Sequence, residues 1–212
     1  MFRSLAFLVC AFSCFCLSAC DGGARDEVRA VFDAYNAALR AHDGAGFLKL
    51  IDPENIKNYG RTVEVARTGD RNAIERLSTG DKAVVTQLRN NFTAQELSKM
   101  DGAEYVRMSV NRGWFFKEED GMRFTLGLIT VKKPRASAWL LVDGVKSDLR
   151  FEFVEVEHQW LVNDECMSTW IDREIEEDAR ASRMSVDTYI LEVESMESGK
   201  KVTREIWENP PR

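Results

Sequence analysis

Residues 30–52, AVFDAYNAALRAHDGAGFLKLID, hold the pattern that decides the predicted fold. Over residues 26–42 the apolar side chains recur at helical spacing and polar side chains take the opposite face, which predicts an amphipathic helix. Asp43-Gly44 breaks this helix and can cap a second, short one. That second helix is expected to stop at Asp52-Pro53, because proline disfavours helical geometry in the residue before it.

The chain from residue 53 to residue 102 is expected to hold further short helices. Apolar residues are sparse over 55–80, where only 73–77 predict a helix. The Thr-Gly-Asp triplets at 68–70 and 79–81 are each expected to end one segment and cap the next. A helix is predicted to open at Asp81, and residues 93–96 match a capping box. The helical part is expected to end near Asp101-Gly102.

Beyond Gly102 the hydrophobic period changes from 3.6 to 2, which predicts a sheet. The pattern indicates a long strand over 106–116, a turn at 118–121, and then more strands joined by turns at 143–144 and 157–158. The later strands are predicted over 122–131, 138–142, 149–156 and 160–162. The alternation changes phase at 128–129 and at 153–154, which predicts β-bulges that bend the sheet.

The last part of the chain is predicted to be helical again. Thr169 and Asp172 can cap a charged helix, and an apolar stripe over 186–196 indicates another. Several acids lie within 172–178, but calcium loops need a defined ligand spacing with a glycine, so these acids are interpreted as a solvated helix face. We therefore predict a domain over 26–166 and a charged helical extension over 167–212.

This order of elements predicts an α+β fold, with N-terminal helices packed on a curved antiparallel sheet that forms a cone-like half-barrel. The segments 30–52 and 149–165 (LRFEFVEVEHQWLVNDE) resemble the nuclear transport factor 2-like superfamily. The first is similar to that family's opening helix and short second helix, and the second to its closing hairpin. The resemblance covers roughly 24–165. That superfamily includes ketosteroid isomerase-like and polyketide cyclase-like enzymes and many non-catalytic members, so it does not decide the function.

The first twenty residues, MFRSLAFLVCAFSCFCLSAC, predict the location of the protein. Arg3 precedes an apolar run over 5–17, which is shorter than the roughly 20 residues of a membrane span and typical of a signal peptide. Residues 17–20, Leu-Ser-Ala-Cys, resemble the lipobox of bacterial lipoproteins. The resemblance implies removal of residues 1–19, lipid (palmitate-like acyl chains) on Cys20, and a tether over 20–25. Asp21 resembles a signal for retention in the inner membrane.

These features predict a lipid-anchored protein of the bacterial cell envelope that faces the periplasm or the exterior. Two alternatives are an ordinary secretory signal cut near Ala19 and an uncleaved membrane anchor. Two or more acyl chains hold a protein stably on a membrane, whereas one holds it only marginally. The membrane is thus the one partner that the sequence indicates directly.

Composition narrows the possible functions. Residues 20–212 carry 28 basic and 35 acidic side chains, a net charge of −7, and such a chain does not favour nucleic-acid binding, which needs a basic surface. Three of the five cysteines leave with the signal peptide and Cys20 carries lipid, so only Cys166 remains. No intramolecular disulfide is then possible, and Cys166 is expected to be a small buried side chain.

No catalytic or metal-binding set is predicted. The superfamily's isomerases place an aspartate base soon after the second helix, where this chain has Asn58 and Tyr59. His42 and His158 are too few for a three-histidine zinc site. A nucleophilic pair of Cys166 and His158 lacks a partner that would orient it. We expect no cofactor and no metal.

The leading hypothesis is a non-enzymatic envelope lipoprotein whose half-barrel binds a small apolar ligand or a partner protein. A cone open at one end would favour a ligand, and a cone filled by its own side chains or by the C-terminal segment would exclude one. The alternatives are a small hydrolase or isomerase acting on an apolar metabolite, and a scaffold that docks an envelope protein through 167–212. Core packing is the competing interpretation of the candidate ligand-binding residues, which are Tyr35, Trp114, Phe116, Phe124, Phe151 and Phe153.

Overall fold

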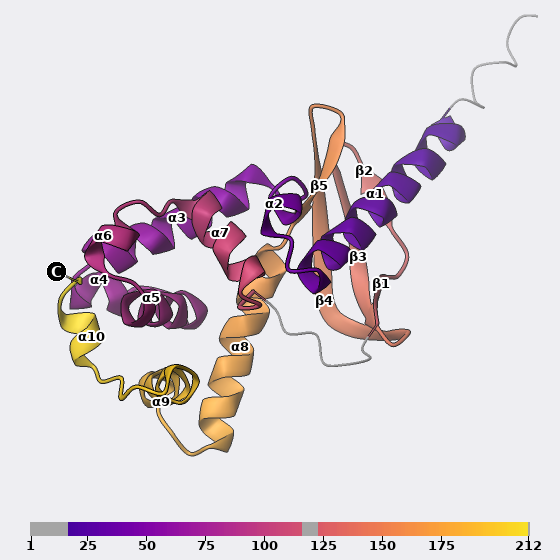
Figure 1. The fold of residues 1–212 in the computed structure, drawn as a ribbon. Coiled ribbons are helices and arrows are strands. Elements are labelled where there is room, and N and C mark those ends of the chain that lie inside the picture. The colour runs from indigo at the N-terminus through magenta and orange to yellow at the C-terminus, as the bar shows by residue number, and fades with distance from the viewer. Residues whose placement is uncertain (1–16, 116–122, 212) are drawn as a thin grey trace, which may run out of the picture.

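The computed structural model describes residues 17–115 and 123–211, with side chains from residue 22 onward. It is an α+β structure in which helices pack against a curled antiparallel half-barrel (Figure 1). Helices precede the sheet: α1 (Leu17–Arg40), α2 (Gly44–Phe47), α3 (Pro53–Thr68), α4 (Arg71–Glu75), α5 (Thr79–Asn91), α6 (Ala94–Leu97) and α7 (Gly102–Asn111). The sheet follows: β1 (Phe124–Leu126), β2 (Thr130–Lys132), β3 (Arg135–Val142), β4 (Val145–Val156) and β5 (Gln159–Asn163). The chain then returns to helix: α8 (Glu165–Ala181), α9 (Val186–Ser198) and α10 (Glu205–Glu208).

The sheet has the strand order β1-β3-β4-β5, and β2 pairs with β3 beside β1. Both predicted two-residue turns are present, with positive φ angles at Asp143 and Gly144 and at Glu157 and His158. The predicted bulge at 153–154 is wrong, because β4 pairs with both neighbours in continuous register there. The register shifts instead opposite Trp139–Leu141 in β3.

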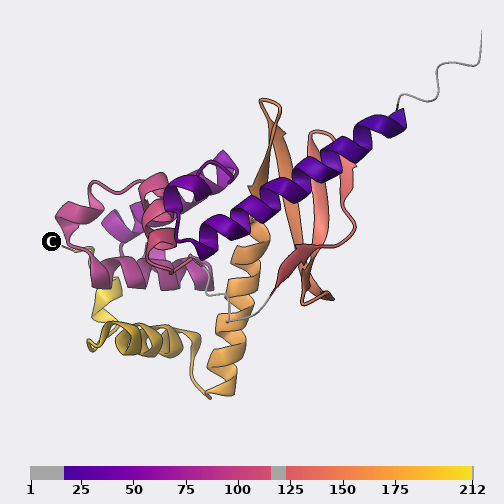
Figure 2. The same cartoon turned by 45° about the vertical axis from the view of Figure 1, so that its right-hand side comes forward.

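Helix α1 crosses the sheet and packs its apolar face on it, as Figure 2 shows. The Phe32 ring meets the Phe151 ring edge-on, with the centroids 5.2 Å apart, and Phe153 packs beside it with a centroid separation of 6.4 Å. All three side chains are at most 3 % exposed. Helix α1 begins at Leu17, so residues 20–25, expected to form a tether, are helical.

The strand predicted over 106–116 is wrong, because residues 102–111 form α7. The Asp101 carboxylate accepts a hydrogen bond from the Glu104 backbone N–H at 2.8 Å and caps this helix. Tyr105, Val106, Ser109 and Val110 are buried at helical spacing. The apolar residues over 106–110 fit the strand period of 2 and also the helical period of 3.6. Packing of this segment against α3 favours the helix.

A close approach of two backbones joins α7 to α3. A Cβ atom built on Gly102 would lie 2.1 Å from the Ile56 carbonyl oxygen and 2.7 Å from the Gly60 nitrogen, so only glycine fits there. Helix α3 itself was not expected from the sequence. The predicted end of the second helix at Asp52-Pro53 is wrong, because α2 already ends at Phe47. Asp52-Pro53 starts α3 instead: the Asp52 carboxylate accepts from the Glu54 N–H and proline occupies the first turn.

Three capping predictions are confirmed and two are wrong. Asp43 caps α2, because its carboxylate accepts a hydrogen bond from the Gly46 N–H at 2.9 Å. Gly69 and Asp70 end α3 and cap α4, and the capping box at Thr93 and Glu96 is present. The second triplet, 79–81, lies inside the first turn of α5, which Ser78 caps. Helix α8 begins at Glu165, with Asp164 as its first flanking residue, so Thr169 and Asp172 do not cap it. The predicted helix over 186–196 is present as α9.

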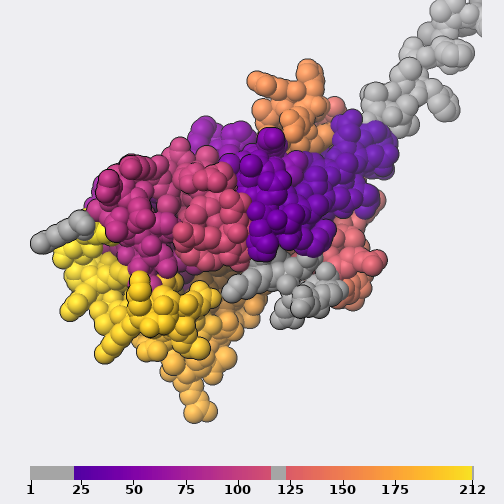
Figure 3. Space-filling view, viewed as in Figure 1, coloured from indigo at the N-terminus to yellow at the C-terminus, as the bar shows by residue number. Residues whose placement is uncertain are grey.

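The C-terminal helices dock on the α3–α5 part of the molecule, against which they lie in the space-filling view (Figure 3). Arg89 of α5 is 6 % exposed, and its guanidinium donates to the carbonyls of Ala66 at 2.9 Å, Val65 at 3.1 Å and Ile206 at 2.9 Å. Trp207 is buried and donates to the Thr86 hydroxyl at 2.8 Å. These bonds hold residues 204–209 against the C-terminal end of α3 and the middle of α5.

Candidate functional site

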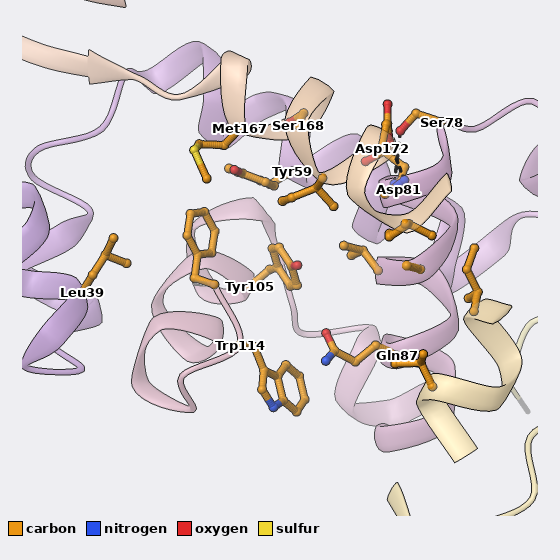
Figure 4. A pocket seen from close by; sticks show the side chains of 18 of the residues that line it. Leu39, Tyr59, Ser78, Asp81, Gln87, Tyr105, Trp114, Met167, Ser168 and Asp172 are labelled. Carbon is orange, nitrogen blue, oxygen red and sulfur yellow. Dashed lines mark hydrogen bonds between the residues drawn. The ribbon is translucent and has the colours of Figure 1, made fainter. Parts of the chain in front are cut away.

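An apolar pocket of about 260 Å³ lies at the junction of the half-barrel and the helical layer. Its walls come from α1, α3, α5, α7, the sheet, α8 and α9, so segments far apart in the sequence meet there. Figure 4 shows Tyr105 and Trp114 on one side and Met167 of α8 across from them. The other apolar side chains include Leu39, Ala83, Val84, Leu140, Ile171, Ile175, Ile190 and Val193.

The pocket includes four of the six aromatic residues predicted to bind a ligand, namely Tyr35, Trp114, Phe124 and Phe151. Phe153 is 1 % exposed in the core beneath α1 and does not line the pocket. Phe116 lies outside the described residues, as do the side chains of Cys20 and Asp21. Trp114 follows α7 and is not on a strand, so it reaches the pocket from the helical layer.

Aromatic side chains of α1 cover part of the sheet face, while Phe124, Leu140 and Phe151 of the sheet line the pocket. The pocket lies beside that contact, and the C-terminal helices α8 and α9 form one of its walls. The sequence predicted an apolar edge on helix α8 at Ile171 and Ile175. Only the fold, which packs α8 against α5, shows that these two residues line the pocket. Tyr59 and Tyr105 could not be assigned because α3 was not predicted and α7 was predicted as a strand.

Three tyrosines give the pocket its polar atoms on the side of α1, α3 and α7. Tyr59 packs against the Tyr105 ring at a centroid distance of 5.8 Å and against Phe115 at 5.4 Å. Burial raises the pKa of Tyr35 and Tyr59 well above the usual value and that of Tyr105 to about 12. The three hydroxyls are therefore protonated at neutral pH and can donate hydrogen bonds.

A buried carboxylate lies behind Tyr59. Asp164, fully buried between β5 and α8, accepts hydrogen bonds from the Asn55 side-chain amide and from the Tyr59 hydroxyl, the latter at 3.4 Å. Burial raises the pKa of Asp164 to about 6, although these two donors favour the charged form. Asp164 itself does not line the pocket, but Tyr59 does, so this pair connects the pocket to a titratable group.

Polar side chains mark the opposite end of the pocket, along α5 and α8. The Asp172 carboxylate accepts from the Gly80 N–H at 2.6 Å, and the Asp81 carboxylate accepts from the Thr62 hydroxyl at 2.8 Å. Gln87 extends from α5 toward Tyr105 and Trp114, as Figure 4 shows. The apolar walls thus have a few polar groups at fixed positions, as small-molecule sites do.

Cys166 and His158 do not form a nucleophilic pair. They lie beyond opposite ends of β5, and His158 is exposed in the β4–β5 turn. Burial raises the pKa of the Cys166 thiol to about 12, so the thiolate form is disfavoured. His42 is the other histidine, and its Nδ1 lies 3.1 Å from the Val110 carbonyl oxygen, which holds the turn after α1 to α7.

Neither a metal-binding cluster nor a helix able to cross a membrane is found among the described residues. Residues 17–115 and 123–211 contain no group of three or more His, Cys, Asp or Glu side chains that could hold a metal ion. Within the same residues no helix combines the length and the apolar character needed to cross a membrane.

Comparisons with models of protein families, with curated proteins and with solved structures found no match to this chain. Its class is therefore defined by structure alone: an α+β protein in which a half-barrel and a helical layer share an apolar pocket. The resemblance to the nuclear transport factor 2-like superfamily stays a prediction.

Proposed function

We propose that this protein is a membrane-anchored lipoprotein of the bacterial envelope that binds a small apolar ligand in the pocket between α1, α5, α7, α8 and the sheet. One observation carries the proposal: an apolar pocket of about 260 Å³ lined by aromatic rings. An engineered dry cavity of about 150 Å³ holds benzene, and sites for larger ligands begin at about 300 Å³. A ligand of roughly two benzene-sized groups fits this scale.

The walls of the pocket support a site that exists before the ligand arrives. Hydrogen bonds across elements hold them in place, such as Gly80 to Asp172 between α5 and α8 and Lys82 to Asp187 between α5 and α9. Lys82 and Asp187 also form an ion pair with an N–O distance of 2.9 Å. A pocket whose walls are fixed loses little conformational entropy on binding, which favours affinity.

Ligand binding is tested by titrating the protein with an environment-sensitive apolar dye and displacing the dye with octanol. We expect saturable, displaceable binding that Val84→Trp weakens at least tenfold, because the indole fills the pocket from α5. Val145→Trp is the matched control, since Val145 is 71 % exposed in β4 and does not line the pocket. Circular dichroism checks that each variant is folded. Absence of dye binding, or equal loss in both folded variants, would contradict the proposal.

The anchor is tested separately by Cys20→Ala in the full chain. Cys20 lies in the first turn of α1, and Figure 1 places that end of the helix across the molecule from α9 and α10. An anchor there leaves the α8–α10 side of the molecule farthest from the attachment point. We expect the variant to move from the membrane fraction to the soluble envelope fraction. Unchanged membrane association would exclude lipid on Cys20 as the anchor.

A second candidate function, an isomerase acting on an apolar metabolite, is favoured by the Tyr59–Asp164 pair. The ionised Asp164 accepts the one hydrogen of the Tyr59 hydroxyl; a protonated Asp164 can instead donate to the Tyr59 oxygen, which leaves the Tyr59 hydrogen for a substrate carbonyl in the pocket. The test follows exchange of the α-protons of small cyclic ketones in heavy water by nuclear magnetic resonance. Exchange that Tyr59→Phe abolishes would favour this candidate, and exchange at the rate without protein would exclude it for these ketones.

A further inference from the structure

The charged side chains that line the pocket all carry the same sign. They are Asp81, Asp172, Glu194 and Glu197, and the described lining residues include no Lys, Arg or His. The pocket is defined by its aromatic walls and not by these acids. The acids determine which charge a molecule in that pocket meets.

Neutral groups, and not cations, hold three of these carboxylates. Asp81 accepts from the Thr62 hydroxyl, and Asp172 accepts from the Gly80 backbone N–H. Glu194, which is 6 % exposed, accepts from the side-chain amides of Asn90 at 2.6 Å and Asn91 at 2.9 Å. Among the ion pairs between described residues, none includes these three carboxylates.

The basic side chains near the pocket have other positions and partners. The Lys82 ammonium pairs with Asp187, and the exposed Arg112 guanidinium lies 4.9 Å from the centroid of the Trp114 ring. Burial raises the pKa of Glu194, whereas the amides of Asn90 and Asn91 and the charge of Lys200 act in the opposite direction. None of the three lines the pocket, so the negative charge there is not cancelled by a lining cation.

The aromatic walls favour the same kind of ligand. The faces of Trp, Tyr and Phe rings attract a cation within about 6 Å of the ring centroid. Tyr59, Tyr105 and Trp114 line the pocket together with the carboxylates. Aromatic rings and carboxylates around an apolar space, with no basic side chain among the described lining residues, form the combination that recognises an organic ammonium ion.

We propose that the pocket selects an organic cation, a small apolar body that carries a protonated amine or a quaternary ammonium group. This inference rests on the proposed ligand-binding function and names the chemical class of its ligand. An apolar anion of the same length, such as a fatty acid, meets the lining acids with the wrong charge and is rejected by repulsion and by loss of its hydration.

Three probes of equal chain length test the proposal: octylamine, octanol and octanoate, each titrated calorimetrically at pH 7 and one ionic strength. An alkyl amine, like the lysine ammonium, is protonated at this pH, and octanoate is ionised. We expect octylamine to bind at least tenfold more tightly than octanol, and octanoate to bind more weakly than octanol.

Variants that remove one charge assign the effect to the lining carboxylates. Asp172→Asn and Glu194→Gln keep an oxygen acceptor for their donors, and each is expected to weaken the binding of octylamine about fivefold more than it weakens the binding of octanol. Glu177→Gln is the matched control, because Glu177 is exposed on α8 and does not line the pocket. It should change neither affinity.

The outcomes separate this inference from the proposed function. Equal affinities for the three probes, or octanoate as the tightest, would overturn cation selectivity and leave ligand binding intact. If none of the three probes binds, while dye titration also fails, the proposed function itself is wrong. An octylamine preference that persists in both charge-removed variants would overturn the assignment to these carboxylates.

Discussion

The contact between α1 and the sheet differs in kind from the packing of the helical layer around α5. Beneath α1 the Phe32 ring meets the rings of Phe151 and Phe153 edge-on, with almost no exposure. The helical layer also buries apolar side chains, but its buried residues include Thr86, Arg89, Glu194 and Asp164, each with a specific hydrogen-bond partner. Burial of apolar side chains holds both contacts, and the helical layer adds directional bonds to it.

This difference explains why the pocket lies where the two parts meet. Apolar side chains can pack closely in many arrangements, so Phe32, Phe151 and Phe153 leave almost no exposed surface where α1 lies on the sheet. A hydrogen bond fixes one particular pair of residues. The Gly80–Asp172 bond holds α8 at a set position against α5, and the Asn90–Glu194 bond does the same for α9. Side chains between elements fixed in this way need not close every space, and the pocket is the space that remains.

The largest expected effect tests the apolar contact. Phe153→Ala should lower the free energy of unfolding by about 3–5 kcal/mol, because it removes a large buried side chain and leaves a cavity. Chemical denaturation followed by circular dichroism measures the change. Val145→Ala is the control, since this side chain is 71 % exposed and its loss should have little effect. A loss below about 1 kcal/mol for Phe153→Ala would mean that the sheet core is not closely packed.

Arg89→Met tests the directional bonds. It keeps much of the side-chain volume but leaves the carbonyls of Ala66, Val65 and Ile206 without their donor, so we expect a loss of about 2–4 kcal/mol. The C-terminal segment should also become more sensitive to protease, which mass spectrometry of the fragments measures. Arg67→Met, whose side chain is exposed and pairs within α3, is the control. Equal stability of the Arg89 variant and this control would show that the bonds are dispensable.

A smaller effect, which depends on pH, distinguishes the two parts by its sign. The pKa of Asp164 is raised to about 6, so between about pH 4 and pH 6 the folded chain holds a proton that the unfolded chain has lost. The free energy of unfolding should therefore fall as the pH rises through this window, by up to about 3 kcal/mol. Above pH 6 this group adds no further change. Asp164→Asn should remove this slope, measured as the difference between wild type and variant at each pH.

Asp148 on the sheet provides the opposite case. The Arg173 guanidinium lowers the pKa of this exposed carboxyl, so its contribution to stability is present above the usual pKa and is lost as the pH falls. Asp148→Asn should therefore remove a small gain in stability with rising pH. If Asp164→Asn and Asp148→Asn change the slope of the unfolding free energy against pH in the same direction, the prediction that the buried and the exposed carboxyl have opposite effects is wrong.

The antiparallel half of the fold could be predicted because its signals are local. Asp143-Gly144 and Glu157-His158 are turn residues between alternating runs, and both turns are present. The Thr93–Glu96 capping box likewise needs only four consecutive residues. By contrast, α7 was predicted as a strand, because the alternation at 106, 108 and 110 does not show that Gly102 must meet Gly60 across α3.

The site was less accessible to prediction than the fold. Tyr35, Phe124 and Phe151 could be proposed from their place on apolar faces, and Trp114 from its apolar character. Asp164 offered no signal, since a single acid after a strand is common, and only the burial of its carboxylate beside Asn55 and Tyr59 distinguishes it. Glu194 likewise lies in the helix predicted from the apolar stripe over 186–196, where no local pattern shows that it faces two asparagines of α5.

The sequence by itself determined the α+β class, the hairpin turns, the long first helix and the expectation of a lipid anchor, because each depends on residues close together in the chain. The tertiary structure alone decided that residues 102–111 are helical, that α1 packs across the sheet, and that the pocket lies between the sheet and the helical layer. It also decided that the acids of α5, α8 and α9 face one apolar space. The physical reason is that burial and charge compensation depend on elements that meet only after folding.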